Sequence, residues 1–332
     1  MTDFQRYLLE EFVEDYEEGL LTRRDALKLL VGVTGSLAMA TTILAACAPP
    51  TQPATTGAPT AAPTSTTVPT TAPTNTAMPQ ATATTASTAT AAPTATTMTS
   101  SGDIEASDVE FPGEGATLIG YLARPVGAGP FPAVLVCHEN RGLTEHIKDV
   151  TRRVAQAGYV GLAVDLLSRQ GGTAAIADST QVPGLLSGAP QDQYVQDFTS
   201  GWRYLQQQPN VKADSVGMTG FCFGGGVTWR VAIGLPELRA AVSFYGPPPS
   251  TDEVKDIQAA VLAIYAERDQ RITGTAEAME AAMKADNKIF EKVIYPNTDH
   301  AFHNDTGTRY NAEAAKDAWA KTLAWFDQYL KT

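Results

Sequence analysis

Charged residues are missing from a long stretch of this 332-residue chain. None of its 24 basic and 36 acidic residues lies between Ala48 and Gly102, where Thr, Ala and Pro predominate. Such a composition buries too little apolar surface to offset the entropy lost on ordering. We therefore expect residues 48–102 to be a disordered tether. It would join a short head, residues 1–47, to a body, residues 103–332, whose length suits a single domain.

Basic residues and cysteines are also scarce. The formal net charge is −12, and the body contains no run rich in Lys or Arg, which argues against a nucleic acid partner. The three cysteines, Cys47, Cys137 and Cys222, show no spacing suited to a structural zinc site. We expect no metal and no organic cofactor, so each cysteine needs its own explanation.

The head combines two arginines with an uncharged segment. Arg23 and Arg24 precede the run from Leu29 to Ala46 and follow a long acidic leader, and the pattern resembles a twin-arginine export signal. The run ends in Leu44-Ala45-Ala46-Cys47, which resembles a bacterial lipobox. These resemblances imply an exported, extracytoplasmic protein that is lipid-anchored to the membrane through Cys47. The alternatives are a transmembrane span, which needs roughly 20 apolar residues, and an incidental apolar cysteine.

The body alternates short apolar runs with longer amphipathic ones. An opening hairpin is followed by strands that are apolar throughout, which is typical of a mostly parallel sheet with helices on both faces. The expected strands are Ala133–Cys137, Tyr159–Val164, Ser215–Thr219, Ala240–Phe244, Val261–Tyr265 and Lys288–Tyr295, and the expected helices include His146–Ala157, Gln191–Gln207, Gly224–Ile233, Gly274–Lys284 and Thr308–Leu330. In such α/β folds the chemistry gathers at the carboxyl ends of the strands.

One strand end has the pattern of a nucleophile elbow. In the segment Gly220-Phe221-Cys222-Phe223-Gly224, glycines lie two positions before and two after a cysteine, as a tight strand-to-helix turn requires. The turn predicts an exposed thiol at a helix N-terminus, where the positive end of the helix dipole favours thiolate. The alternative is a buried cysteine beside a glycine-rich phosphate loop, but the Gly-Lys-Ser/Thr sequence of such loops is missing.

A nucleophile of this kind needs an acid and then a histidine later in the chain. Asp269 follows the strand that ends at Tyr265, and His300 follows the strand that ends at Tyr295. We therefore assign the acid to Asp269 and the base to His300. The rival base is His303, and the rival acids are Glu267 and Asp299.

Five segments together resemble the dienelactone hydrolase family, a cysteine branch of the α/β-hydrolases. They are Cys137-His138-Glu139-Asn140-Arg141-Gly142, Asp165-Leu166-Leu167-Ser168-Arg169, the elbow, the Asp269 loop and His300-Ala301-Phe302. The resemblance implies an α/β-hydrolase fold and ester or lactone hydrolysis by acyl transfer. It also implies that Glu139 contacts the thiol and helps to form the thiolate. The oxyanion hole would be formed by the backbone amides of Asn140 and Phe223.

The chain departs from the family where the family's arginines hold a substrate carboxylate. The segment after the histidine is His303-Asn304-Asp305, and Arg141 and Arg169 are the remaining candidates for substrate contact. A small-molecule ester or lactone is expected, with a true dienelactone doubtful. A thioesterase or peptidase on the same scaffold, or a non-catalytic binding module, is the alternative. Cys137 is expected to be buried and inert rather than disulfide-bonded to Cys222.

Overall fold

The structure is a computed structural model that describes residues 1–46, 99–101 and 103–331. Cys47 and nearly all of the predicted tether lie outside the described residues. Thr99–Ser101 forms strand β1, so the sheet begins inside the segment that we assigned to the tether. The reason is backbone pairing, because β1 adds antiparallel to the edge of β2 and needs no apolar side chains to do so.

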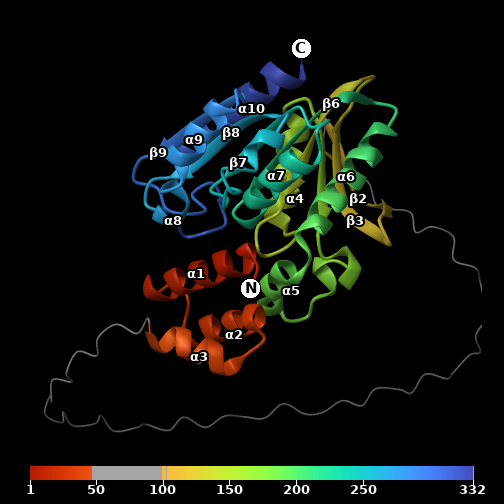
Figure 1. Cartoon of the computed structure of the whole chain (residues 1–332). Coiled ribbons are helices and arrows are strands. Elements are labelled where there is room, and N and C mark those ends of the chain that lie inside the picture. The colour runs from red at the N-terminus through yellow and green to blue at the C-terminus, as the bar shows by residue number, and fades with distance from the viewer. Residues whose placement is uncertain (47–98, 102, 332) are drawn as a thin grey trace, which may run out of the picture. The chain divides into compact units, whose positions relative to one another are not determined.

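The described residues form a nine-stranded sheet in the order β1-β2-β3-β5-β4-β6-β7-β8-β9 (Figure 1). Its strands are β1 (Thr99–Ser101), β2 (Ile104–Gly113), β3 (Ala116–Pro125), β4 (Phe131–Cys137), β5 (Val160–Asp165), β6 (Val211–Phe221), β7 (Ala240–Phe244), β8 (Ala260–Ala266) and β9 (Phe290–Tyr295). The pairs β1–β2, β2–β3 and β3–β5 are antiparallel, and the pairs from β5–β4 to β8–β9 are parallel.

Helices cover both faces of this sheet. The main ones are α4 (Glu145–Gln156), α6 (Gln191–Gln206), α7 (Phe223–Gly234), α9 (Ala276–Ala285) and α10 (Ala312–Leu330). Gly161 of β5 and Gly217 of β6 are in register with the same residue of β4, so they share a face, and they approach α4 and α10 respectively. Gly201 of α6 packs against Leu135 and Leu162 on the opposite face. The predicted α/β-hydrolase fold with a mostly parallel sheet is confirmed.

The connection between β5 and α6 contains structure that we did not predict. It holds three single-turn 3₁₀ helices, Ser168–Gln170, Thr173–Ala175 and Ser179–Gln181, and the short helix α5 (Val182–Gly188). The carboxylate of Asp165 at the end of β5 accepts hydrogen bonds from the backbone N–H groups of Leu167 and Thr173. A single buried carboxylate thereby fixes a loop whose sequence has no helical periodicity.

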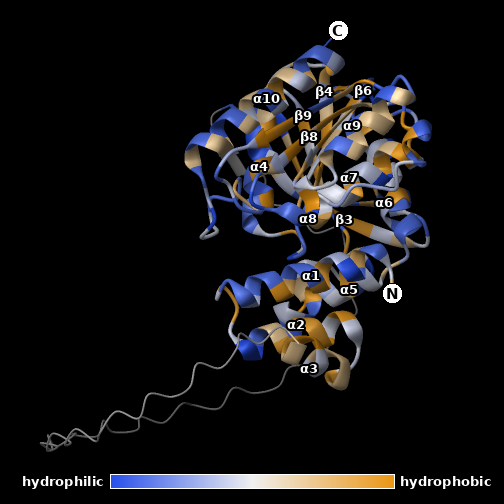
Figure 2. Cartoon of the chain, turned by 60° about the vertical axis from the view of Figure 1, so that its left-hand side comes forward, coloured by the Kyte–Doolittle hydropathy of each residue, from blue (hydrophilic) through white to orange (hydrophobic). Residues whose placement is uncertain are grey.

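The head forms three helices in the described residues: α1 (Asp3–Glu17), α2 (Arg23–Thr34) and α3 (Leu37–Ala46). Thr2 and Gln5 make a reciprocal capping box at the start of α1. The predicted uncharged run is broken where Gly35, with φ of 67°, ends α2. No helix in the described ranges has the length and apolar character to span a bilayer. In Figure 2 the ribbon of α2 carries both hydrophilic and hydrophobic residues, and that of α3 is coloured mainly as hydrophobic.

The head packs on the body. The backbone of Gly32 in α2 comes so close to Gly184 in α5 that a Cβ added to Gly184 would lie 2.2 Å from the carbonyl oxygen of Gly32. Two glycines therefore permit this close helix contact. Helix α1 in turn lies against the edge where the parallel strands end, as Figure 1 shows beside α5 and α8 (Gln270–Thr273).

Candidate active site

The elbow has the geometry that its glycines predict. Cys222 separates β6 from α7 with φ of 58°, a conformation that a residue with a side chain adopts only under constraint. A Cβ on Gly220 would lie 2.1 Å from the carbonyl oxygen of Gly224, and one on Gly224 would lie 2.4 Å from that of His138. The backbone N–H of Cys222 donates to the carbonyl of Phe244 at 3.0 Å. These close backbone contacts hold the thiol at the strand end.

Asp269 and His300 meet beside this thiol. The ring Nδ1 of His300 lies 2.6 Å from a carboxylate oxygen of Asp269, and both side chains are buried. Burial opposes protonation of His300, but the carboxylate of Asp269, and Cys222 when its thiol is ionised, raise its pKa well above the usual value. Burial acts to raise the pKa of Asp269, and His300 outweighs that effect and lowers it. The Asp269 carboxylate therefore fixes the orientation of the His300 ring and stabilises a positive charge on it.

The rival residues are occupied elsewhere. His303 stacks on Phe221, and burial lowers its pKa to about 3. Asp299 pairs with the exposed Arg268. Glu267 accepts a hydrogen bond from the backbone N–H of Asn297. Among the described residues, only Asp269 is bonded to a histidine that faces the thiol.

The thiol is not exposed, contrary to our prediction. Cys222 is only 3% exposed, because the side chains of Tyr7 and Glu11 from α1 lie over it. The Tyr7 hydroxyl is 3.3 Å from Sγ of Cys222 and 3.2 Å from Nε2 of His300, so it bridges the two reacting atoms. Glu11 carboxylate oxygens lie 3.5 and 3.7 Å from Sγ.

Sequence reasoning missed Tyr7 and Glu11 because the head was interpreted only as a signal. The available clue was the leader itself, where Phe4, Tyr7, Leu8, Glu11 and Phe12 share one helical face and all are buried. An export leader has no need of such a face.

Helix α1, which forms the cover of the site, also changes the electrostatics of the Cys222 thiol. Burial raises the pKa of Cys222, the neighbouring Glu11 carboxylate raises it further, and His300 acts in the opposite direction. The helix N-terminus of α7 alone therefore does not decide the ionisation of this cysteine. With α1 in place, the neutral thiol is favoured.

Glu139 lies in the site but makes a different contact from the one that the family resemblance implied. Its Oε2 accepts a hydrogen bond from the side-chain amide of Asn304 at 2.8 Å, and its pKa is raised by burial to about 7. Tyr7 and Glu11 lie within hydrogen-bond distance of Sγ, and His300 interacts with it as well. Glu139 thus stands in the wall of the site, and Glu11 occupies the place beside the sulfur.

The two backbone amides assigned to the oxyanion hole belong to loops that the elbow brings together. Phe223 is the first residue of α7, where backbone N–H groups have no partner within the helix. Asn140 follows β4 and is buried, and its side-chain amide donates to Glu11 at 2.8 Å. The carboxylate of Glu11 therefore lies against both Asn140 and the thiol, where a substrate carbonyl would otherwise fit.

The two candidate substrate arginines differ. Arg169 donates twice from Nη1 to the buried carboxylate of Asp197, at 2.9 and 2.7 Å, and from Nη2 to the carbonyl of Glu114. These bonds indicate a structural role for Arg169. Arg141 is exposed, and its positive charge acts to lower the pKa of Glu139. Arg141 thus keeps a position from which it could contact a substrate.

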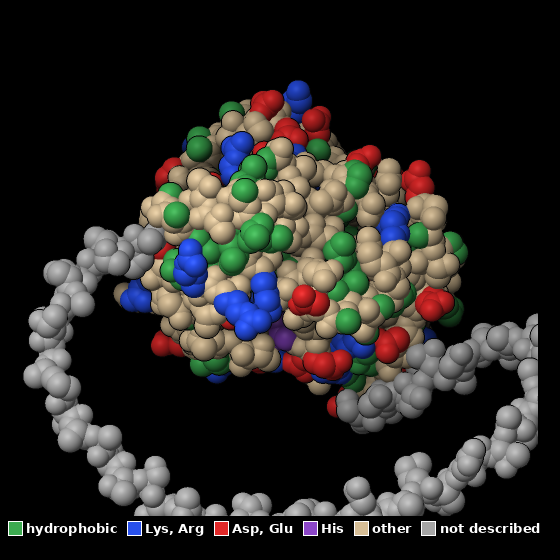
Figure 3. Space-filling view, turned by 90° about the horizontal axis from the view of Figure 1, so that it is seen from below, with side chains coloured by type: hydrophobic (Ala, Val, Ile, Leu, Met, Phe, Trp, Pro, Cys, Tyr) green, Lys and Arg blue, Asp and Glu red, His purple; other side chains and the backbone are tan. Residues whose placement is uncertain are grey.

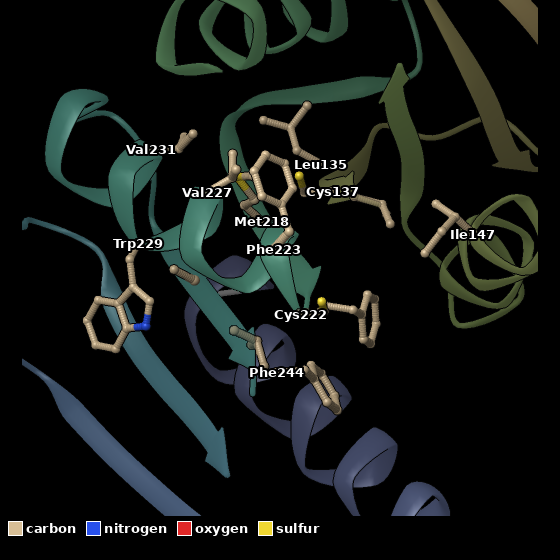
Figure 4. Close-up of a cluster of buried hydrophobic side chains, with 14 of the residues drawn as sticks. Leu135, Cys137, Ile147, Met218, Cys222, Phe223, Val227, Trp229, Val231 and Phe244 are labelled. Carbon is tan, nitrogen blue, oxygen red and sulfur yellow. The ribbon is translucent and has the colours of Figure 1, made fainter. Parts of the chain in front are cut away.

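Cys137 is fully buried at the end of β4, and both Cys137 and Cys222 are free thiols (Figure 4). Burial raises the pKa of Cys137 well above its usual value. A thiol without solvent access and without thiolate character is unreactive. The expectation of an inert, unbridged Cys137 agrees with this arrangement.

One group of side chains in the described part of the chain could bind a metal ion. Ligand atoms of Glu11, Cys222 and His300 lie within 4.8 Å of one another. Carboxylate, thiolate and imidazole are ligands that zinc accepts. The same atoms here bond to Tyr7, Asn140 and Asp269.

A thiol at a strained elbow and a histidine–carboxylate pair after the last strands define a hydrolase of the α/β-hydrolase fold. The model of the Dienelactone hydrolase family matches residues 118–330. The chain belongs to this family.

Relatives support the same conclusion. A protein of Methylorubrum extorquens, provisionally assigned as a carboxymethylenebutenolidase, is 35% identical over 243 residues, which cover 70% of this chain and 84% of that protein. A relative from Salmonella typhi with the same provisional assignment is 36% identical and covers 70% and 90%. A crystal structure from Klebsiella pneumoniae, provisionally assigned as a dienelactone hydrolase, has a TM-score of 0.64 and 38% identity, and covers 68% and 99%. These matches identify a lactone or ester hydrolase.

Proposed function

We propose that this hydrolase cleaves carboxylic esters or lactones by acyl transfer to Cys222, with His300 as base and Asp269 as the group that orients it. The observation that carries the proposal is the 2.6 Å contact between Asp269 and His300, made beside an elbow thiol. His300 uses Nδ1 for this contact, which leaves Nε2 directed toward the sulfur side of the site.

The reaction would proceed in two steps. Nε2 of His300 takes the thiol proton, and the Cys222 thiolate forms a C–S bond with the substrate carbonyl. The Asn140 and Phe223 amides donate to the resulting oxyanion. The C–O bond then breaks, and the imidazolium returns its proton to the leaving alkoxide. Water, deprotonated by His300, attacks the thioester, and the acid product leaves as the thiol is restored.

The test compares activity in a chain whose thiol is accessible. The double variant Tyr7→Ala/Glu11→Ala removes the two side chains that lie on Sγ. We expect it to hydrolyse p-nitrophenyl acetate and small lactones, and adding Cys222→Ala should lower kcat/KM by about 10³-fold or more. Hydrolysis that persists without Cys222 would contradict the proposed nucleophile. The mutation Cys137→Ala, which removes the other buried thiol, is the matched control and should leave the rate unchanged.

We further propose that the protein is exported and lipid-anchored through Cys47. The support is the order of the segments, with Arg23 and Arg24, an uncharged run, and a lipobox-like cysteine. Cys47 itself lies outside the described residues. The test is the mass of the N-terminal peptide from a membrane fraction. A diacylglyceryl-modified Cys47 at the mature N-terminus is expected, and an intact Met1 terminus in the mature protein would refute the proposal.

A further inference from the structure

We propose that helix α1 is a built-in inhibitor, which binds in the catalytic cleft of the body and denies substrate access to Cys222. The proposal rests on the proposed function only in taking this cleft to be catalytic. The fitting partner is an acidic amphipathic helix, and the chain itself supplies one in Asp3–Glu17.

The side chain of Tyr7 lies between the reacting atoms. Its hydroxyl lies 3.3 Å from Sγ and 3.2 Å from Nε2 of His300, on the path that the thiol proton must take. A hollow of about 610 Å³ lies beside α1, and its wall includes Tyr7 and Arg271. Tyr7 therefore lines this hollow and also contacts the sulfur, which is not part of the lining.

The side chain of Glu11 occupies the place of a substrate beside Sγ. Its carboxylate accepts a hydrogen bond from Asn140 at 2.8 Å and lies 3.5 Å from Sγ. A carboxylate has the planar shape of an ester group. Its negative charge also raises the pKa of Cys222, so the thiol is shielded and kept protonated at once.

Helix α1 also packs on the body through apolar side chains. The ring of Phe4 lies 4.8 Å from that of Phe223 and 5.6 Å from that of Tyr194 between centroids. It also fills the space where Gly226 lacks a side chain, since a Cβ there would lie 2.7 Å from Phe4. The glycine after the elbow thus accommodates a side chain from the head.

The rim of the site is complementary in charge to α1. Residues 1–18 contain seven acidic residues and one basic residue. Three body arginines pair with them: Arg271 with Glu14 at 2.8 Å, Arg309 with Asp15 and Glu18 at 2.6 and 2.7 Å, and Arg230 with Asp3 at 3.6 Å. Figure 3, seen from the side of the head, shows Lys, Arg, Asp and Glu side chains close together around a histidine.

The body holds its own site without α1. Cys222, His300 and Asp269 are positioned by β6, β9 and β8, and no residue of α1 supplies a member of this triad. Loss of α1 would therefore uncover the site and leave its geometry in place. Cleavage at Cys47, under the proposed export, would remove α1 together with the signal and activate the enzyme outside the cytoplasm.

The test measures access to Cys222 in the full-length chain. The rate of alkylation by iodoacetamide, assigned to Cys222 by peptide mass spectrometry, and kcat/KM for p-nitrophenyl acetate are compared among variants. Both should rise at least tenfold in Tyr7→Ala/Glu11→Ala. They should stay unchanged in Glu17→Ala, which removes an exposed charge from the same helix. Equal alkylation rates in all three chains would overturn the proposal.

Two further variants separate blocking from electrostatics. Glu11→Gln keeps the shape of the side chain and removes its charge, so it should increase alkylation less than the double variant does. Arg309→Glu should loosen α1 and speed alkylation, and combining it with Asp15→Lys and Glu18→Lys should restore slow alkylation. If the reversed charges do not restore slow alkylation, the ion pairs of Arg309 with Asp15 and Glu18 do not hold α1 on the body.

A peptide and a chelator provide two further tests. A synthetic peptide of residues 1–18 should inhibit the double variant competitively, whereas a peptide that carries Tyr7→Ala and Glu11→Ala should not. EDTA should leave the wild type blocked, and full release by EDTA would assign the block to a metal and overturn the proposal. If alkylation of Cys222 rises as expected but no ester or lactone is hydrolysed, the result supports α1 as a block to Cys222 and contradicts the proposed hydrolysis.

Discussion

The catalytic residues and the helix that covers them are held in different ways. Cys222 is fixed by backbone: Gly220 and Gly224 allow contacts that no side chain could fit, and its N–H is bonded to β7. Helix α1 is held through side chains: Phe4, Leu8 and Phe12 lie on its buried face, and arginines of the body pair with its acidic residues.

This contrast teaches which part can move. The turn at Cys222 can move only together with the strands beside it, whereas a single helix docked through side chains can leave the surface as a unit by local opening. The site is therefore a rigid product of the sheet, and the cover is a separable addition.

The largest effect is expected on activity from the acid of the triad. In the Tyr7→Ala/Glu11→Ala background, Asp269→Asn should lower kcat by about 10³-fold, because His300 loses the carboxylate that fixes its tautomer. Steady-state kinetics measures the change. The matched variant Asp299→Asn, at the neighbouring rival acid, should change kcat less than about threefold. Similar losses in both variants would remove Asp269 from its assigned role.

The next effect concerns the elbow backbone. Gly220→Ala places a Cβ 2.1 Å from the carbonyl oxygen of Gly224, so the turn cannot form without a shift. We expect a loss of about 3 kcal/mol or more in the free energy of unfolding, measured by urea denaturation. Gly188→Ala is the control, because no atom lies within 4 Å of its added Cβ. A neutral Gly220→Ala would show that the turn is less tight than described.

The smallest effect lies at the boundary between body and cover, at Glu139. Burial raises its pKa from 4.5 to about 7, so the folded state binds the proton more tightly than the unfolded state does. The stability from this group is full below pH 4.5 and is lost as the pH rises through 7. Relative to Glu139→Gln, the wild type should lose about 2 kcal/mol between pH 5 and 8.

Thermal or urea unfolding at several pH values tests this prediction for Glu139. The exposed Glu237, changed to Gln, serves as the control and should show no such pH dependence. A constant difference between wild type and Glu139→Gln across this range would contradict the raised pKa.

The body was predictable from sequence because its signals are local. Apolar runs marked the strands, and the order of Cys222, Asp269 and His300 followed from their places after three of those strands. The loop that leads to α5 escaped prediction, since its first part is organised by hydrogen bonds from Leu167 and Thr173 to the Asp165 carboxylate and not by an apolar periodicity.

The cover could not be predicted because it depends on contacts between residues far apart in the chain. Tyr7 and Cys222 are 215 positions apart, and nothing in either local sequence links them. The export-signal interpretation of the head gave no reason to expect a buried face on Phe4, Leu8 and Phe12. The exposed thiol was predicted from the elbow motif and is wrong for this chain, because Tyr7 and Glu11 of α1 lie on the sulfur.

The most direct test of the account is to trap the acyl group. The Tyr7→Ala/Glu11→Ala variant is mixed with p-nitrophenyl acetate, quenched in acid within milliseconds, digested and mapped by mass spectrometry. The account predicts an acetyl group on the peptide that contains Cys222, absent from the unvaried chain at the same time point. Acetylation of another residue, or none on Cys222 while nitrophenol is released, would contradict it.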